Sequence, residues 1–348
     1  MTGLALERQR RSPYRWRAMA ERVFPILFIT ASRIGDAVLS SGLVKTLADE
    51  VPGARFTVVG SALTAPLFSE VPGLEALMVM EKRAAGRHWV ELWRKVRKRR
   101  WGLVVDLRGS ALSGVLRRRR RAVHRVGGPR AHKVVEAARV LKLDASPPSP
   151  FLFTNRTIEA RAEFLTAGKQ PILAIAPAAN WVGKTWPSER FALTARRLLG
   201  PGGPMAGGRL MVIGGPDDMI VAEPVKAAVP STRRIDLVGR EELLVCYAAL
   251  KRAHLFIGND SGLMHLAAAA GTPTLGVFGP SDEAVYGPWG PNGRTVRGVR
   301  SFQQFKQADP RLNQEICHMM DLPVGAVLDA ANALIGETAL EYPHASDL

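Results

Sequence analysis

Short β-branched runs alternate with longer amphipathic segments in two consecutive series, and this alternation limits the fold more than any other feature. The first series has strand-like runs at 26–30, 54–60, 76–80, 102–107 and 122–127. The second has such runs at 171–177, 209–215, 234–239, 255–260 and 273–279. Strands that alternate with helices are typical of parallel sheets with crossover helices. The sequence therefore predicts two doubly wound α/β domains in tandem.

Helices are expected between these strands. Their predicted ranges are 36–49, 87–99, 157–167, 188–199, 217–228, 241–252, a helix from Ser261, and a closing helix at 323–338. The prolines of 144–156 break periodic structure and predict a linker. A chain of 348 residues also exceeds the usual size of one hydrophobic core. We expect a basic lead over 1–22, a first domain over 23–150, and a second over 151–340 with the closing helix.

The formal net charge is +17, and much of it is clustered in the lead, at 94–100 and at 117–121. Such charge attracts nucleic acid, anionic lipid or polyanionic substrates and does not choose among them. Solvated helix faces explain such runs equally well. The apolar run 23–30 is too short for a signal peptide, and no segment approaches the roughly 20 apolar residues of a membrane span. We expect a cytoplasmic protein that is soluble or peripherally bound to a membrane.

The two cysteines, Cys246 and Cys317, have no paired spacing, so neither a disulfide framework nor a zinc site is expected. The chain also has no GxGxxG after a strand, no phosphate loop of the GxxxxGK type, no HExxH and no GxSxG. Dinucleotide redox, nucleoside triphosphatase and serine hydrolase functions therefore lose most of their support. No DxD metal motif is apparent, so no bound metal and no cofactor are predicted.

Ligands of open α/β sheets collect at the carboxyl ends of the strands, which directs attention to the loops there. In the loop 31–43, Gly35 permits a tight approach and Asp36 opens a predicted helix. Helix capping explains an aspartate at such a position about as well as function does. As chemistry, the Asp36 carboxylate could take a proton from an incoming hydroxyl.

The loop 176–191 follows the first strand of the second domain. Lys184 could reach a phosphate from this loop, and Asn180 could donate to the same group. A surface lysine beside a tryptophan is the plain alternative. Pro187 is placed to start the next helix.

The loop 257–273 ends a strand and begins a helix of unusually small residues. Asp260 is expected to cap that helix, and the amides of Ser261, Gly262 and Leu263 open it. Free amides at a helix start favour an anion such as a diphosphate. His265 in the first turn could reach the same ligand, although a buried histidine with satisfied hydrogen bonds is the alternative. The loop 276–282 is expected to line the same cleft.

These loops resemble the ADP-heptose:lipopolysaccharide heptosyltransferase family, glycosyltransferase family 9. The resemblance covers about residues 24 to 335 and rests on motifs that follow the family order: RIGDAVLSSGLVKTL, VVDLRG, APAANWVGKTWPSERF, VIGGPDD, VGREELL, GNDSGLMHLAAAAGTP and FGPSD. It implies a GT-B fold, in which two Rossmann-like domains face each other across a cleft, with the acceptor on the first and the nucleotide sugar on the second.

The implied reaction is inverting and independent of metal. By resemblance, Asp36 matches the general base, Lys184 the lysine at the donor phosphates, and Asp260 to His265 the donor loop. Asp218 aligns loosely with an acidic residue that contacts the ribose. The implied partners are a nucleotide-sugar donor, lipopolysaccharide or another glycolipid as acceptor, and the anionic surface of the inner membrane, with no nucleic acid.

The sequence departs from the family at two places. Ala176-Pro177-Ala178 stands where the family often has His-Pro-Gly, and Asp260-Ser261-Gly262 where it has Asp-Thr-Gly. Another nucleotide-sugar transferase, or an epimerase acting on a nucleotide sugar, therefore stays an alternative. A non-catalytic basic protein that binds RNA or lipid is an alternative of a different class, although only 7% of the residues are aromatic and no RNA-module signature joins the basic runs.

Overall fold

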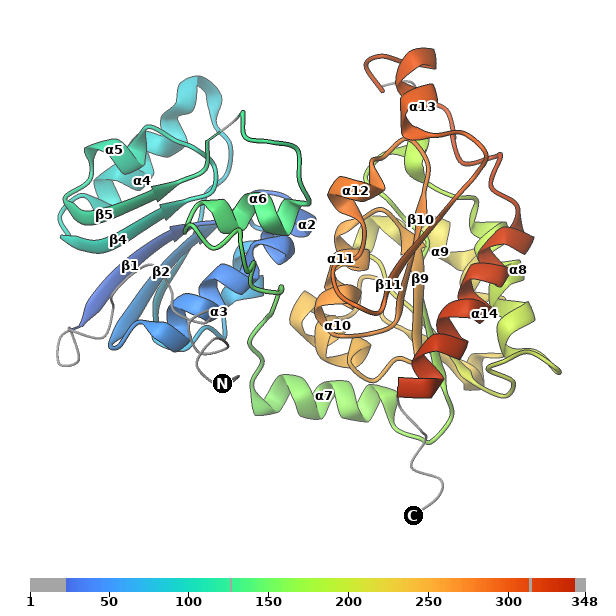
Figure 1. The fold of residues 1–348 in the computed structure, drawn as a ribbon. Helices are drawn as coiled ribbons and strands as arrows, with labels where there is room; N and C mark the ends of the chain where they lie inside the picture. Colours follow the sequence, from blue (N-terminus) through green and yellow to red (C-terminus); the bar gives the residue numbers. More distant parts are fainter. Residues whose placement is uncertain (1–22, 126, 313–314, 342–348) are drawn as a thin grey trace, which may run out of the picture. The chain divides into compact units, whose positions relative to one another are not determined.

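A computed structural model describes residues 23–125, 127–312 and 315–341. The basic lead over 1–22 lies outside the described residues. The chain forms two compact units that divide between Phe153 and Thr154. Each unit contains one parallel sheet with helices packed against it (Figure 1).

The sheet of the first unit has the strand order β3-β2-β1-β4-β5, and all of its pairings are parallel. Its strands are β1 (Phe24–Ile29), β2 (Ala54–Gly60), β3 (Leu74–Val79), β4 (Trp101–Asp106) and β5 (Arg118–Val123). Its helices are α2 (Ile34–Leu39), α3 (Ser41–Glu50), α4 (Arg87–Val96), α5 (Leu112–Val115) and α6 (Lys133–Arg139). Every residue of β4 is buried, as expected for a central parallel strand covered on both faces.

Two expectations for this unit need correction. The helix predicted over 36–49 is broken into α2 and α3, because the Ser40 hydroxyl donates to the carbonyls of Asp36 and Ala37. Such a side-chain bond competes with the regular helix ladder. The strand predicted over 122–127 lies at 118–123 instead, so the arginines read as a solvated run form most of β5.

The sheet of the second unit has the order β11-β10-β9-β6-β7-β8, again parallel throughout. Its strands are β6 (Ile172–Ala176), β7 (Arg209–Val212), β8 (Arg234–Asp236), β9 (Leu255–Asn259), β10 (Thr274–Phe278) and β11 (Gly293–Arg297). Its helices are α7 (Arg156–Thr166), α8 (Ser188–Leu199), α9 (Met219–Lys226), α10 (Leu243–Leu250), α11 (Gly262–Ala269), α12 (Glu283–Tyr286), α13 (Phe302–Ala308) and α14 (Val324–Glu341). β11, α12 and α13 were not predicted from the sequence.

The core of the second unit joins the sheet to α8 and α14, which pack on the same face. Leu198 of α8, Leu275 of β10 and Leu334 of α14 belong to one buried cluster. On α7, Glu159 pairs with Lys251 at 2.7 Å, and Arg161 pairs with Glu241. These ion pairs fasten α7 to α10 and its flanks, so α7 belongs structurally to the second unit.

The strand orders define where ligands are expected. In each sheet the chain builds outward in one direction and then crosses back to build in the other, which leaves a switch point between two central strands. This point lies between β1 and β4 in the first sheet and between β6 and β9 in the second. Open α/β sheets bind ligands beyond the carboxyl ends of the strands at such points.

Candidate functional site

At the switch point of the second sheet, the loop that carries Lys184 meets the start of α11. We call residues 177–187, which follow β6, the lysine loop. Lys184 Nζ lies 3.2 Å from Asp260 Oδ2, and the two side chains are 18% and 8% exposed. The residues of this pair are 76 positions apart in the chain. The sequence named both residues, and the fold brings them together.

Asn259, the last residue of β9, holds the lysine loop through two side-chain hydrogen bonds. Its side-chain Nδ2 donates to the Pro177 carbonyl at 2.7 Å, and its Oδ1 accepts from the Trp186 amide at 2.9 Å. The Asn259 side chain is fully buried, so both bonds are shielded from water. Sequence reasoning missed Asn259, although an asparagine at the end of a buried strand was a visible signal.

The segment 317–322 holds the lysine loop from another side. The His318 amide donates to the Gly183 carbonyl at 3.1 Å, and the Trp186 indole donates to the Leu322 carbonyl at 3.0 Å. Cys317 Sγ lies 3.2 Å from the Thr185 carbonyl. The sequence pattern did not predict these contacts, because the two segments are more than 130 residues apart in the chain.

The start of α11 is arranged to receive an anion. Ser261 is the N-cap, with extended φ and ψ of −150° and 171°, and its side chain makes no capping bond. The prediction that Asp260 caps this helix is therefore wrong, since its carboxylate faces Lys184 instead. Ser261 Oγ is buried and has no hydrogen-bond partner among the described residues. Gly262 and Leu263 are partly exposed, and the first amides of a helix have no partners within it. The helix start thus offers amide donors next to the Lys184–Asp260 pair.

His265 is the fourth residue of α11. It is 4% exposed, and its Nε2 lies 3.9 Å from Asp260 Oδ1. The carboxylate of Asp260 is therefore flanked by Lys184 on one side and by His265 on the other. A buried carboxylate held in this way orients the lysine and limits its motion.

The structure leaves Asn180 and Asp218 apart from the Lys184–Asp260 pair. Asn180 is exposed in the lysine loop. Asp218 Oδ2 accepts from the Gly215 amide at 2.7 Å in a short 3-10 turn after β7. Neither side chain bonds to Lys184 or Asp260 among the residues that the structure describes. Because β7 neighbours β6, Asp218 lies one strand away from the switch point, and its contact with a ribose stays a prediction.

Asp106 organises the switch point of the first sheet. It is fully buried and accepts from the Arg108 amide at 3.0 Å, the Ser110 amide at 2.9 Å and the Ser110 hydroxyl at 2.6 Å. Burial lowers the pKa of the Arg108 guanidinium, while the negative charge of Asp106 opposes that shift. The sequence predicted a strand here and contributed the motif VVDLRG to the resemblance, but Asp106 was not assigned to a site.

Asp36 lies in the loop and helix that follow β1, beside β4 in the sheet. It is the third residue of α2, and the N-cap position belongs to Arg33 without a side-chain bond. Helix capping therefore does not explain Asp36. Asp36 lies in the first turn of α2, where a negative charge interacts favourably with the helix dipole. The role of Asp36 as a base stays a prediction.

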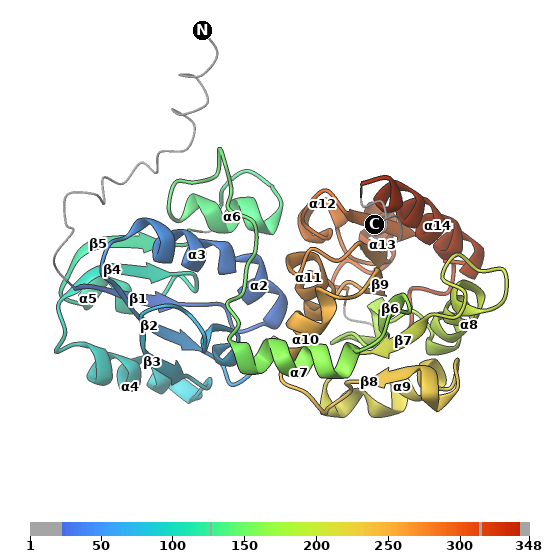
Figure 2. The same ribbon diagram turned by 90° about the horizontal axis from the view of Figure 1, so that it is seen from below.

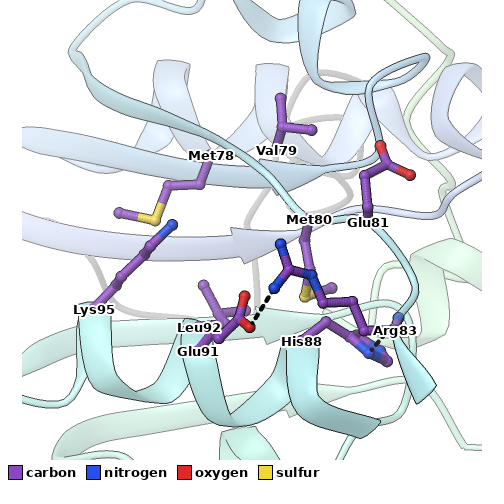
Figure 3. A pocket seen from close by; sticks show the side chains of 9 residues that line it. All are labelled: Met78, Val79, Met80, Glu81, Arg83, His88, Glu91, Leu92 and Lys95. Carbon is purple, nitrogen blue, oxygen red and sulfur yellow. Dashed lines mark hydrogen bonds and ion pairs between the residues drawn. The ribbon is translucent and has the colours of Figure 1, made fainter.

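A separate cavity of about 150 Å³ lies between β3 and α4. Figure 3 shows Met78, Met80 and Leu92 on its apolar side, and Arg83 paired with Glu91 at 2.7 Å across it. The His88 ring accepts from the Arg83 amide at 3.2 Å. Because β3 is the edge strand on the other side of β2 from β1, this cavity lies away from the switch point and outside the candidate site.

Within the described ranges, no group of three or more His, Cys, Asp or Glu residues gathers closely enough to hold a metal ion. No helix in the same ranges is both long and apolar enough to cross a membrane.

Solved structures share this architecture over nearly the whole chain. A glycosyl transferase family 9 protein from Veillonella parvula matches with a TM-score of 0.73 and 20% identity, over 92% of this chain and 99% of that one. The Escherichia coli ADP-heptose lipopolysaccharide heptosyltransferase II matches with a TM-score of 0.72 and 21% identity, over 90% and 99%. At this level of identity the likeness shows the fold, which is GT-B.

Sequence comparison gives the family. Lipopolysaccharide heptosyltransferase 2 of Salmonella typhimurium is 24% identical, over 90% of this chain and 99% of the relative. Lipopolysaccharide heptosyltransferase 3 of Escherichia coli is also 24% identical, over 88% and 96%. The fold and these relatives together indicate a glycosyltransferase. The family model "Glycosyltransferase family 9 (heptosyltransferase)" matches residues 129–314, and the chain belongs to this family.

Proposed function

We propose that this enzyme transfers a heptose from ADP-heptose to the inner core of lipopolysaccharide, with inversion at the anomeric carbon and without a metal ion. The observation that carries the proposal is the Lys184–Asp260 pair beside the open start of α11. It supplies a cation, free amides and a hydroxyl where a nucleotide diphosphate needs them. The named relatives, matched over nearly their full lengths, support the sugar and the acceptor.

In the proposed reaction, an acceptor hydroxyl oxygen attacks the anomeric carbon of the donor. The bond from this carbon to the diphosphate oxygen breaks, and the electron pair leaves with ADP. Asp36 takes the hydroxyl proton. Lys184 and the amides of 261–263 stabilise the charge that develops on the leaving diphosphate. Asn180 and Asp218 are proposed to contact the nucleotide, and His265 to support the site through Asp260.

A transfer assay with a panel of nucleotide sugars tests this function. We expect ADP release and a mass increase of one heptose on an inner-core acceptor only with ADP-heptose. Transfer from another donor would replace the heptose assignment. This alternative has a structural basis, because Ala176 and Ala178 are buried and present no polar side chain to the donor. Conversion of the donor sugar without transfer would indicate an epimerase instead.

We also propose that the enzyme works peripherally at the cytoplasmic face of the inner membrane, on a glycolipid acceptor and without a nucleic-acid partner. The net charge of +17 supports an anionic surface as partner. Cell fractionation tests the location: the enzyme should sediment with inner membranes at low salt and be released by high salt. Release by detergent alone would contradict an electrostatic, peripheral association.

A further inference from the structure

The net positive charge of this protein is carried by residues 1–153. Residues 23–153 contain 23 lysines and arginines against 10 aspartates and glutamates. Residues 154–348 contain 19 of each and are neutral overall. The two parts have the same type of fold, so neither the fold nor a general need for solubility accounts for the difference. A local excess of this size indicates a polyanionic partner for the first unit.

The structure joins two basic runs into one surface. The Trp101 amide donates to the Arg117 carbonyl at 2.8 Å, and Trp101 pairs with Arg118 in the sheet. This pairing places the residues after α4 beside the start of β5. We call the result the basic edge. It comprises eight cations: Arg97, Lys98, Arg100, Arg117, Arg118, Arg119, Arg120 and Arg121. Lys95 lines the cavity beside β3, and Arg99 pairs with Glu75 of β3, so neither is counted.

The basic edge is distinct from the catalytic edge of the sheet. Its residues lie at the amino ends and along the side of β4 and β5, whereas the loops with Asp36 and Asp106 follow the carboxyl ends. β5 is the outermost strand and pairs only with β4 (Figure 2). Arginines there do not lie where the proposed chemistry takes place, and the basic edge therefore needs a partner of its own.

Two arginines of β5 are held in place by neutral groups. Arg118 donates to the carbonyls of Gly114 at 3.0 Å and Leu116 at 2.8 Å, and Arg121 donates to the Ser113 hydroxyl at 3.0 Å. Such bonds order these two side chains without cancelling their charge. A few cations suffice to protect an edge strand from pairing with another chain. Eight cations on this edge exceed that requirement.

Apolar and indole groups accompany the cations. Val115, just before β5, is 68% exposed. The Arg97 guanidinium lies 4.7 Å from the centre of the Trp93 ring. Arginine, indole and exposed aliphatic side chains together suit a lipid headgroup region, where apolar parts enter the interface while charges stay at phosphates. RNA would call for exposed aromatic platforms for the bases instead.

We propose that the basic edge docks the enzyme on an anionic lipid bilayer. β5 has six residues and rises about 3.3 Å per residue, so the cations at its amino end lie roughly 20 Å from the loops at the carboxyl ends. The location at the inner membrane rests on the proposed function; docking through the basic edge is the new inference.

The test compares two double variants of the full chain. Arg117→Gln with Arg119→Gln removes two exposed charges from the basic edge, and neither side chain is needed for a hydrogen bond described above. Arg196→Gln with Arg197→Gln removes two exposed charges from α8 in the neutral unit and is the matched control. Binding is measured by flotation with phosphatidylcholine vesicles that contain phosphatidylglycerol, and with vesicles of phosphatidylcholine alone.

We expect the unmodified protein to bind only the vesicles with phosphatidylglycerol, and less as salt increases. Each removed charge should weaken binding about fivefold, so the Arg117/Arg119 variant should bind roughly 30-fold more weakly. The control variant should bind like the unmodified protein. Both should transfer sugar to a water-soluble acceptor at the normal rate, which separates failed docking from failed chemistry.

Three results would overturn the proposal. Equal losses in the two variants would mean that net charge alone drives binding. Unchanged binding of the Arg117/Arg119 variant would mean that the basic edge makes no contact with lipid. Displacement of the protein from the vesicles by an equal phosphate concentration of single-stranded RNA would indicate nucleic acid as the preferred partner. A failure of sugar transfer with normal vesicle binding would instead contradict the proposed function alone.

Discussion

The indole of Trp181 occupies the space where a side chain at Gly183 would lie: a Cβ on Gly183 would come 2.3 Å from Trp181 Cζ2. The Trp181 ring also lies 5.7 Å from the ring of His318, centre to centre. The backbone amide of His318 donates to the Gly183 carbonyl. This packing sets the path of the chain just before Lys184. The position of the Lys184 ammonium group therefore depends on a glycine that touches no ligand.

Gly183→Ala should displace the lysine loop and weaken donor binding. Overpacking of this kind typically costs about 1 to 3 kcal/mol, and the loop absorbs it by shifting. Donor affinity, measured by calorimetry, should fall at least tenfold. In a Lys184→Ala background the same substitution should change affinity little, because the loop then has no lysine to position. Gly336→Ala, in a helix with open space around the added methyl, is the control. Additive effects of the two substitutions would contradict a role through Lys184.

Lys184→Ala alone should lower the transfer rate about 10²- to 10³-fold, as expected when a preorganised positive group is removed from a leaving diphosphate. It also leaves the buried carboxylate of Asp260 without its cation, so thermal stability should be measured in parallel. Lys251→Ala, which breaks an exposed ion pair with Glu159, should leave the rate unchanged. Full donor affinity together with a full rate would remove Lys184 from the site.

The pattern of the sequence was sufficient for the two parallel sheets, because buried strands and amphipathic helices alternate with little ambiguity. It also gave Lys184 and Asp260, since both follow central strands of one sheet. It placed β5 at 122–127 and not at 118–123, because the arginines of this strand lack apolar alternation. An edge strand is solvated along one side and tolerates such residues, so β5 was not recognisable by hydrophobicity.

The supports of the site were equally hidden. Asn259 and His318 act on the lysine loop through backbone groups of Pro177, Trp186 and Gly183. Every residue type except proline has the same backbone donor and acceptor, so a bond to the backbone does not restrict the residue type. Such contacts therefore cannot be recognised from the sequence. Asp36 shows the opposite case: its residue type suggested a helix cap, and only the observed start of α2 at Ile34 removes that explanation.

Ser261→Ala should separate binding from stability. The Ser261 hydroxyl is buried without a hydrogen-bond partner in the described part of the chain, so its removal should leave the melting temperature unchanged or raise it slightly. Donor affinity should fall about tenfold, because a hydrogen bond to a charged group contributes roughly 1.5 to 3 kcal/mol. Ser261→Thr, which keeps the hydroxyl, should retain affinity. A loss of stability with unchanged affinity would show that the hydroxyl serves the fold.

Cys246 should make stability depend on alkaline pH. Burial, with a smaller contribution from the charge of Glu241, raises the pKa of the Cys246 thiol from 9.0 to about 12. Because the thiol binds its proton more tightly in the folded state, the protonated thiol contributes its full stabilisation below pH 9. This contribution is lost as the pH rises from 9 toward 12. The difference in unfolding free energy between the protein and Cys246→Ala should shrink by up to about 4 kcal/mol across this range. Urea titrations at several pH values measure it, with Cys317→Ala as control. A difference independent of pH would exclude a titrating thiol.

Asp36→Asn tests the chemistry most directly, because it removes the proton acceptor and keeps the shape of the side chain. A general base typically contributes about 10² to 10⁴ in rate, so kcat should fall at least a hundredfold. Donor affinity should not change, since the donor is proposed to bind residues of the other unit, and the melting temperature should change little. Asp49→Asn, which alters an exposed carboxylate paired with Lys45 on the neighbouring α3, controls for the lost charge. Normal turnover by Asp36→Asn would assign the base elsewhere. The buried Asp106 would not replace it, because its carboxylate already accepts three hydrogen bonds from Arg108 and Ser110.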